Sequence, residues 1–187
     1  FSPKYTNTLA QQLKDGISEL GALITYHRSD SNKMKREEIS KLRSMISNDI
    51  GNKYLSANEI DYKEKSKFVQ QGHEAVTPTQ LDRKPEDVKN SLNQDQFKLY
   101  DLIWKRTVAS QMSQQISLET SYLIEDKNFI LRASGVVELF EGFKKIYNFS
   151  EKKDDQQKLP DLKKGDNLKI ARIAVSYTHL RAHETDR

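Results

Sequence analysis

A tyrosine, an arginine and an aspartate lie close together in the segment ITYHRSDS, at Tyr26, Arg28 and Asp30. A tyrosine can attack phosphorus once its phenol loses a proton and a cation neutralises the phosphate. Arginine suits the second task because its planar guanidinium stays charged and binds two phosphate oxygens at once. The trio permits phosphoryl-transfer chemistry, although Tyr-x-Arg is common. The default interpretation of Tyr26 is a half-buried aromatic at the end of an apolar run.

A second polar segment, GHEAVTPTQL, places His73 and Glu74 beside a proline-containing loop. Histidine titrates near neutral pH, so His73 could hydrogen-bond a phosphate or move a proton. The default role of a single loop histidine is to cap a turn or to fix the loop. Neither segment identifies a function by itself.

The order of the motifs resembles that of a known family. ITYHRSDS resembles the active-site signature of bacterial type IA DNA topoisomerases, usually written ITYMRTDS, and GHEAVTPTQL resembles their later AHEAIRPT segment. KLYDLIWKRTVASQM, at residues 98–112, is similar to the helix that follows, and it favours topoisomerase I over the type III branch and reverse gyrase. Three motifs in the family's order are more specific than any one, and the similarity extends over residues 6–173.

The resemblance implies that Tyr26 attacks a backbone phosphate of single-stranded DNA, which forms a 5′-phosphotyrosyl link and frees a 3′-hydroxyl. The other strand passes through the gap, and the hydroxyl then reverses the attack. Because one phosphoester replaces another, this cycle needs no ATP and relaxes negative supercoils. The expected enzyme is a type I DNA topoisomerase, an isomerase. It acts on single-stranded or negatively supercoiled DNA, as a monomer in the bacterial cytoplasm and nucleoid.

The same resemblance assigns roles to the neighbours of the tyrosine. Arg28 would hold the scissile phosphate and stabilise its developing charge, and His73 would contact the phosphate near Tyr26. Asp30 would position Arg28 or cap the following helix, while Thr25 would support this geometry. The expected catalytic residues are Tyr26, Arg28 and His73. The expected DNA-binding residues are Arg28, Asp30, Thr25 and His73.

Three positions depart from the family pattern. His27 replaces the usual methionine, Ser29 the usual threonine, and Thr77 an arginine. A histidine beside the nucleophile could tune it, but we expect His27 to be a tolerated residue that faces outward. Because Thr77 lacks the positive charge of arginine, we expect weaker contacts with the DNA backbone and a smaller effect on the cleavage reaction.

A cofactor is expected outside this stretch of sequence. Members of the family resemble one another in an N-terminal Toprim domain, where a glutamate and an Asp-x-Asp motif hold Mg²⁺. This chain contains no Asp-x-Asp. We therefore expect Mg²⁺ as the cofactor, no metal ligands among these residues, and an internal fragment that does not relax DNA alone.

The composition excludes several other classes of function. The 187 residues contain no cysteine, which excludes disulfide scaffolds, thiol nucleophiles and zinc ribbons in this stretch. No apolar run is long enough to cross a bilayer, so no membrane partner is expected. A net charge of +4 favours a polyanionic partner, but only mildly.

Apolar spacing predicts the helices that position these residues. The expected helices are 6–20, 36–50, a short one near 85–92, and 95–112. The last is the clearest, because one of its faces carries Tyr100, Ile103, Trp104, Val108 and Met112. Gly21 and Gly51 are expected to close the first two. Residues 21–26 form a β-prone run that ends in the tyrosine, and the Ser/Asp cluster over 29–31 offers a cap for the second helix.

The second half of the chain is β-rich. Alternating and β-branched residues predict strands 116–125 and 128–137, a short helix over 138–148, and a last strand over 168–173. A helical half joined to a β-rich half is the α+β class. By resemblance, residues 1–112 are a fragment of the helical domain with the catalytic tyrosine, and residues 113–173 are part of a β-rich arch or hinge.

The last residues, 174–187, have neither helical nor strand periodicity. The string AVSYTHLRAHETDR looks like translated sequencing-adapter read-through, so we expect a non-native tail. His179 and His183 are spaced like a ligand pair on a helix, but no metal is assigned to them.

Two other functions remain open on the residues alone. One is a non-catalytic module of the same fold that binds single-stranded DNA and stacks bases on Tyr54, Tyr62 and Phe68. The other is a helical interaction domain whose positive charge is incidental. Formation of a covalent DNA adduct identifies the enzyme, and a steep salt dependence of DNA binding separates the two alternatives.

Overall fold

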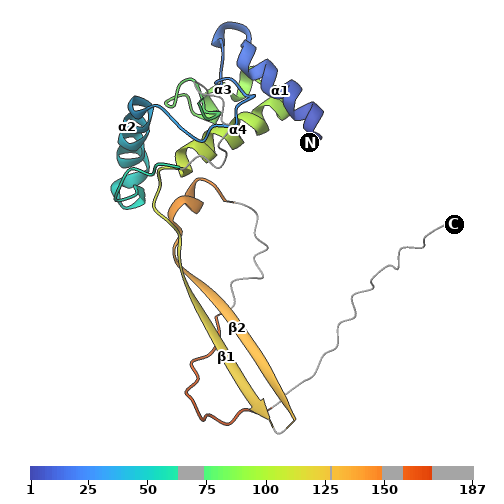
Figure 1. Ribbon diagram of the computed structural model, residues 1–187, viewed down its shortest axis with the longest axis vertical. Coiled ribbons are helices and arrows are strands. Elements are labelled where there is room, and N and C mark those ends of the chain that lie inside the picture. Colours follow the sequence, from blue (N-terminus) through green and yellow to red (C-terminus); the bar gives the residue numbers. More distant parts are fainter. Residues whose placement is uncertain (63–73, 127, 149–157, 170–187) are drawn as a thin grey trace, which may run out of the picture.

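The computed structural model describes residues 1–62, 74–126, 128–148 and 158–169. A helical body lies at one end, and a long antiparallel hairpin extends away from it (Figure 1). The elements are α1 (Pro3–Asp15), α2 (Arg36–Met45), α3 (Pro85–Val88), α4 (Gln94–Ala109), β1 (Ile116–Asp126) and β2 (Phe129–Phe140). The predicted α+β class is confirmed.

Helix α4 forms the centre of the helical body. It begins at a capping box, in which Asn93 Oδ1 accepts from the Gln96 N–H at 2.8 Å and Gln96 Oε1 accepts from the Asn93 N–H at 3.0 Å. Its buried face carries Tyr100, Trp104 and Val108, spaced by about one turn each. This face is the one that the sequence pattern predicts.

Two hydrophobic clusters share helix α4. Around its N-terminal half, Tyr100 packs with Leu13 of α1 and with Leu23 and Ile24 of the following segment. Around its C-terminal half, a second cluster forms with α2; its buried members are Leu42, Ile46, Tyr54, Trp104, Val108 and Met112. The helix therefore ties the segment that carries the tyrosine motif to the rest of the body.

The hairpin joins the body through a small set of contacts. The Tyr54 ring stacks on Phe140 with centroids 5.2 Å apart, and Tyr54 Oη donates to Glu141 Oε1 at 2.7 Å. Gly142 follows with φ 53°, and a Cβ there would lie 2.4 Å from the Gln114 carbonyl oxygen. A glycine is therefore required where the chain returns to the body.

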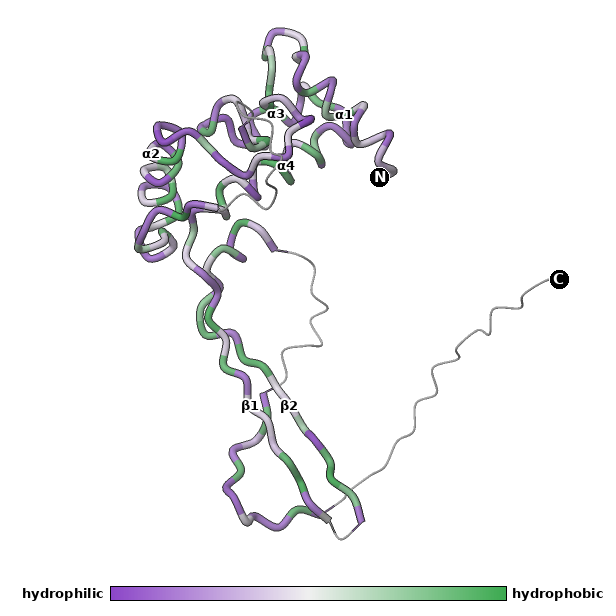
Figure 2. The backbone as a smooth tube through the Cα atoms, viewed as in Figure 1, coloured by the Kyte–Doolittle hydropathy of each residue, from purple (hydrophilic) through white to green (hydrophobic). Residues whose placement is uncertain are grey.

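Beyond this joint the two strands pair in one register from Ser117 with Glu138 to Asp126 with Phe129, and a register shift separates these pairs from Ile116 with Phe140 at the base. Large apolar side chains on them are 46% to 70% exposed, namely Ile116, Leu118, Leu123, Phe129, Ile130, Leu131 and Leu139. Figure 2 shows these apolar stretches along both strands, away from the helices. Tyr122 Oη donates to the Pro160 carbonyl at 3.0 Å, which holds the described segment 158–169 against the hairpin.

The first helix is shorter than the apolar spacing predicts. It ends at Asp15, where Gly16 adopts φ 112°, and not at Gly21. Ile17 and Leu20 continue the apolar pattern because a short 3₁₀ turn packs them against the same cluster. The spacing of buried residues thus continues after the helix has ended.

The remaining helices agree with the prediction, but two local expectations are wrong. Helix α2 continues as a π turn to Gly51, and a 3₁₀ turn over Lys89–Ser91 extends α3. Residues 21–26 form no strand; a single bridge joins Ile24 to Pro78. The Ser/Asp cluster does not cap α2, since the N-cap residue is Lys35 and no side chain caps it.

In the second half of the chain, both predicted strands are confirmed, and each is longer than predicted. β2 continues to Phe140, so the predicted helix over 138–148 is reduced to the turn Gly142–Lys145. Residues 168–169 of the predicted last strand are not in a strand. Residues 170–173 and the tail 174–187 lie outside the described residues.

Candidate active site

The two polar motifs lie side by side. The Thr25 N–H donates to the Thr77 carbonyl at 2.9 Å, and the Thr79 N–H donates to the Leu23 carbonyl at 3.0 Å. These bonds flank the bridge between Ile24 and Pro78. Leu23 and Ile24 are each 1% exposed, so the pair of segments is anchored in the first cluster. The chain emerges from this anchor at Tyr26.

The Thr25 side chain strengthens this junction. Its hydroxyl donates to the Ala75 carbonyl at 3.1 Å and accepts from the Thr77 N–H at 3.0 Å. Both bonds are partly buried, so their loss would leave backbone groups without partners. These two bonds hold Thr25 against residues 75–77, and its expected role at the phosphate site stays a prediction.

A second attachment lies on the other side of the tyrosine. The Ala75 N–H donates to the Lys33 carbonyl at 2.8 Å, and Lys35 pairs with Glu74 at 2.9 Å. Within the loop, Ser29 Oγ accepts from the Ser31 N–H at 3.2 Å. The loop over 26–32 is thus attached at both ends to the same segment, residues 74–79.

The side chains expected to act on a phosphate project from this loop. Tyr26 is 46% exposed, and Arg28 and Asp30 are exposed as well. In the part of the chain that the structure describes, no hydrogen bond or ion pair joins Arg28 to Asp30. The geometry therefore offers Arg28 to an external anion. His73 lies outside the described residues, directly before Glu74.

His27 differs from the expectation that it faces outward. Both ring nitrogens are buried and have no hydrogen-bond partner. Its ring lies 5.8 Å from the Tyr26 ring, tilted by 55°. Burial, followed by the positive charges of Arg28 and Lys14, lowers the pKa of His27 below its ordinary value of 6.5. His27 is a neutral, half-buried neighbour of the tyrosine near pH 7.

Helix α4, which carries the motif of residues 98–112, holds the end of the histidine motif GHEAVTPTQL in place. Sequence reasoning missed this role. On α4, Tyr100 Oη donates to the Arg83 carbonyl at 2.8 Å, and Trp104 Nε1 donates to the Leu81 carbonyl at 3.0 Å. Arg83 in turn donates from Nη1 to the Leu20 carbonyl at 2.9 Å. The polar tips of the aromatic residues on one face of the predicted helix were the available signal.

The same combination of segments occurs in known proteins. The family model described as DNA topoisomerase matches residues 1–186. This chain belongs to that family. The DNA topoisomerase 1 of Rickettsia bellii is 38% identical over 181 residues, which cover 92% of this chain and 23% of the relative. For the DNA topoisomerase 1 of Campylobacter jejuni the identity is 34% over 179 residues, with 94% and 25% covered.

A solved structure shows the same fold. The full-length topoisomerase I of Thermotoga maritima matches with a TM-score of 0.71 and 30% identity, over 87% of this chain and 26% of that chain. The resemblance to bacterial topoisomerase I that the three motifs indicate is confirmed. The chain spans about a quarter of the length of these topoisomerases.

The described part of this topoisomerase segment does not fit a magnesium site. No group of three or more His, Asp or Glu side chains among the described residues could hold a metal ion. None of the helices that the structure describes is long and apolar enough to cross a membrane.

The family's arginine position is occupied by a buried side chain here. Thr77 is 3% exposed, because its backbone pairs with Thr25 and the preceding Val76 packs against the first cluster. The expectation that this position weakens contact with DNA stays a prediction.

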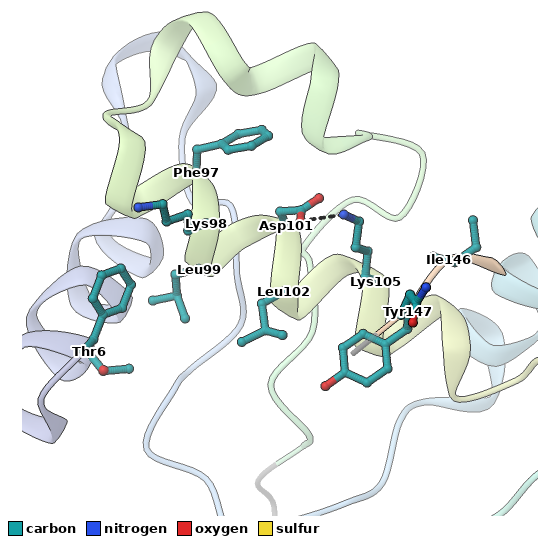
Figure 3. A pocket seen from close by; sticks show the side chains of 11 residues that line it. Thr6, Phe97, Lys98, Leu99, Asp101, Leu102, Lys105, Ile146 and Tyr147 are labelled. Carbon is teal, nitrogen blue, oxygen red and sulfur yellow. Dashed lines mark hydrogen bonds and ion pairs between the residues drawn. The ribbon is translucent and has the colours of Figure 1, made fainter. Parts of the chain in front are cut away.

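A pocket beside α4 lies apart from the tyrosine loop, and no residue of that loop lines it. Its volume is about 540 Å³, and its walls include Phe97, Leu102 and Tyr147 (Figure 3). Lys105 pairs with Asp101 at 2.7 Å along the same wall. Because Asp101 neutralises Lys105, the described wall of this pocket offers no cluster of positive charge that could bind a phosphate.

Proposed function

We propose that the full-length protein is a type IA DNA topoisomerase in which Tyr26 is the nucleophile. It cleaves one strand of DNA without ATP, passes the other strand, religates the break and relaxes negative supercoils. The observation that carries this proposal is an exposed tyrosine on a loop attached at both ends to residues 74–79. Such a loop presents the phenol to a large substrate and limits the movement of its backbone.

In the proposed reaction, Tyr26 Oη forms a bond to phosphorus and the bond from phosphorus to the 3′-oxygen breaks. The phenol loses its proton, and the 3′-oxygen leaves as a hydroxyl after taking one up. The product is a 5′-phosphotyrosyl link, and attack by the 3′-hydroxyl reverses every step. Arg28 lies two residues away and is exposed, so its guanidinium can stabilise the charge that develops on the phosphate oxygens.

The remaining site residues act around this pair. His73 contacts the phosphate near the tyrosine. Thr25 holds the loop through its two hydrogen bonds, and Asp30 contributes to the DNA-binding surface. These assignments rest on the motif positions, supported for Thr25 by its contacts.

The same proposal covers the setting of the reaction. Residues 1–112 form the helical domain with the tyrosine, and residues 113–173 form part of the arch or hinge. The substrate is single-stranded or negatively supercoiled DNA, and the protein acts as a monomer in the bacterial cytoplasm and nucleoid. Mg²⁺ is held by a Toprim domain outside this chain, so this chain alone does not relax DNA.

The decisive experiment replaces the nucleophile in a full-length enzyme that contains this chain. Tyr26→Phe should abolish the covalent adduct with a single-stranded oligonucleotide, while noncovalent binding stays nearly unchanged. Tyr62→Phe is the matched control, because Tyr62 is 44% exposed and its hydroxyl also lies on the surface. An adduct that persists in Tyr26→Phe would show that another residue attacks. Binding without any adduct in the unmodified enzyme would favour the non-catalytic module.

A salt titration tests the role of Arg28. The plot of log affinity against log salt concentration has a negative slope. If the Arg28 guanidinium contacts a phosphate, Arg28→Gln should make this slope shallower by about one. Lys98→Gln is a suitable comparison, since Lys98 is a surface cation that already pairs with Asp95. Equal slopes for the unmodified enzyme and Arg28→Gln would remove Arg28 from the phosphate site.

A further inference from the structure

His27 is a polar side chain without a polar partner next to the proposed nucleophile. Its Nδ1 and Nε2 atoms are both buried, and neither makes a hydrogen bond. The ring lies between Tyr26 and Arg28 in the chain and 5.8 Å from the Tyr26 ring. A buried imidazole with no hydrogen bonds gives no stability in return for its lost hydration. An apolar side chain at position 27 would pack equally well.

The charges that face His27 come from two elements. From its own segment comes Arg28, and from the end of α1 come Lys14 and Asp15. Asp15 is already engaged, with Lys14 Nζ at 3.0 Å and Gln11 Nε2 at 2.7 Å. Two cations therefore oppose a positive charge on the imidazole, and one engaged carboxylate favours it. Burial of the ring, followed by the two cations, keeps the imidazole neutral in the absence of DNA.

A bound phosphate changes this balance. A phosphate that contacts both Tyr26 Oη and the Arg28 guanidinium lies near the imidazole, because the Tyr26 ring is 5.8 Å from the His27 ring and the charge of Arg28 acts on His27. Its negative charge offsets that of Arg28, the cation adjacent to His27. An anion close to a histidine favours its protonated form. The protonated ring would in turn attract the phosphate.

We propose that His27 takes up a proton when a DNA phosphate binds beside Tyr26 and Arg28, so that the site binds single-stranded DNA more tightly as the pH falls. This inference rests on the proposed function, because it places the scissile phosphate at Tyr26. His27 acts here as a positioning residue that adds charge near the phosphate, and it takes no part in the bond changes.

The direction of the effect follows from linkage. In the free protein the pKa of His27 is below 6.5, and in the complex it is higher. Above both values the ring is neutral in both states, so the pH has no effect through His27. Between the two values binding takes up a proton, and below both the full gain in affinity is present. A difference of about one pKa unit corresponds to about tenfold in affinity.

The experiment uses the full-length enzyme with Tyr26→Phe, which prevents cleavage and retains the aromatic ring. The affinity for a single-stranded oligonucleotide is measured from pH 8 to pH 5 at constant ionic strength. We expect a rise of about tenfold on the acid side that is lost in His27→Gln and in His27→Met. Because His73 is unchanged in these variants, its contribution remains in the residual slope. A pH dependence that is the same with and without His27 would overturn the proposal.

Two surface substitutions shift the same curve in opposite directions. Lys14→Met removes a cation that opposes protonation, so the acid-side rise should begin at higher pH. Asp15→Asn removes the carboxylate, so the rise should begin at lower pH. Both side chains are about half exposed, at 40% and 54%, so the fold should tolerate either change. Two curves that coincide with that of the parent would contradict the electrostatic mechanism.

A direct titration separates this inference from the proposed function. With ¹³C-labelled histidine, the His27 resonance is the one missing in His27→Gln, and its pKa should rise when the oligonucleotide is added. An unchanged pKa overturns proton uptake even if Tyr26 forms the adduct. An adduct in Tyr26→Phe overturns the nucleophile assignment, whatever the titration of His27 shows.

Discussion

The helical body and the β1–β2 hairpin bury their apolar residues to very different extents. Leu42 in the body is fully buried between α2 and α4, whereas Leu123 on β1 is 70% exposed. In the body, side-chain packing holds the elements together, and every buried residue of the two clusters lies within residues 9–112. In the hairpin, the paired backbone holds the strands, and most large apolar side chains face solvent.

This difference shows which part can position a reacting group. A core packed at crystal-like density keeps the tyrosine loop in one place, because moving its anchors would open cavities. A two-stranded hairpin without a covered face is marginally stable by itself and is more easily deformed. Substitutions in the body, at the joint with the hairpin and at the anchor of the tyrosine loop therefore distinguish the contributions of these parts to stability and to cleavage.

The largest expected effect is on a matched pair of leucines. Leu42→Ala should lower the free energy of unfolding by about 3 kcal/mol, because it leaves a cavity in the second cluster. Leu123→Ala removes the same atoms from an exposed position and should change the free energy by less than about 0.5 kcal/mol. Urea unfolding followed by the fluorescence of Trp104, the single tryptophan, measures both. Equal losses would show that the hairpin has a buried face.

The joint is tested at a glycine. Gly142→Ala should destabilise the chain by about 2 kcal/mol, because φ is 53° and the new Cβ would collide with the Gln114 backbone. Gly165→Ala also has positive φ, at 96°, but nothing lies within 4 Å, so only the conformational strain of about 1 kcal/mol remains. Unfolding midpoints in urea compare the two. A smaller effect at Gly142 than at Gly165 would mean that the joint yields easily.

The attachment of the tyrosine loop is tested at a threonine. Thr25→Val keeps the shape but leaves the Thr77 N–H and the Ala75 carbonyl without their bonds, so about 1.5 kcal/mol of stability should be lost. In the full-length enzyme, cleavage should slow more than oligonucleotide binding weakens. Thr25→Ser retains both bonds and should rescue cleavage. Wild-type cleavage by Thr25→Val would mean that packing alone holds the loop.

The smallest effect at neutral pH is expected at Tyr100, which bonds helix α4 to the Arg83 carbonyl, two residues after the histidine motif. Tyr100→Phe removes the bond to the Arg83 carbonyl and should cost about 1 kcal/mol. Burial raises the pKa of Tyr100 to about 12, above its ordinary value of 10.0. The folded state therefore favours the neutral phenol.

The stability that the neutral Tyr100 phenol contributes is present below pH 10 and is lost as the pH rises toward 12. Over this interval the unmodified chain should lose about 2 to 3 kcal/mol relative to Tyr100→Phe. Parallel urea titrations at pH 9 to 12 measure the difference. A constant gap across this range would show that the phenol is not held in its neutral form.

Much of the fold could be predicted from local patterns. Helix α4 was predicted because Tyr100, Trp104 and Val108 recur at helical spacing and end in one packed face. The two strands were predicted from alternation, although their exposed faces were not. The end of α1 was missed because Ile17 and Leu20 still pack against the first cluster after the helix has ended. The apolar spacing therefore does not show where the helix stops.

The sequence by itself determined the residue types and their order: a tyrosine with an arginine two residues later, a histidine motif further on, and an aromatic helix after both. These local patterns indicated the family. Only the tertiary structure decided that Thr25 meets Thr77, 52 residues away, and that His27 turns its nitrogens inward. The physical reason is that such contacts depend on hydrogen bonds and burial between distant segments, and the spacing of residues within one segment carries no information about them.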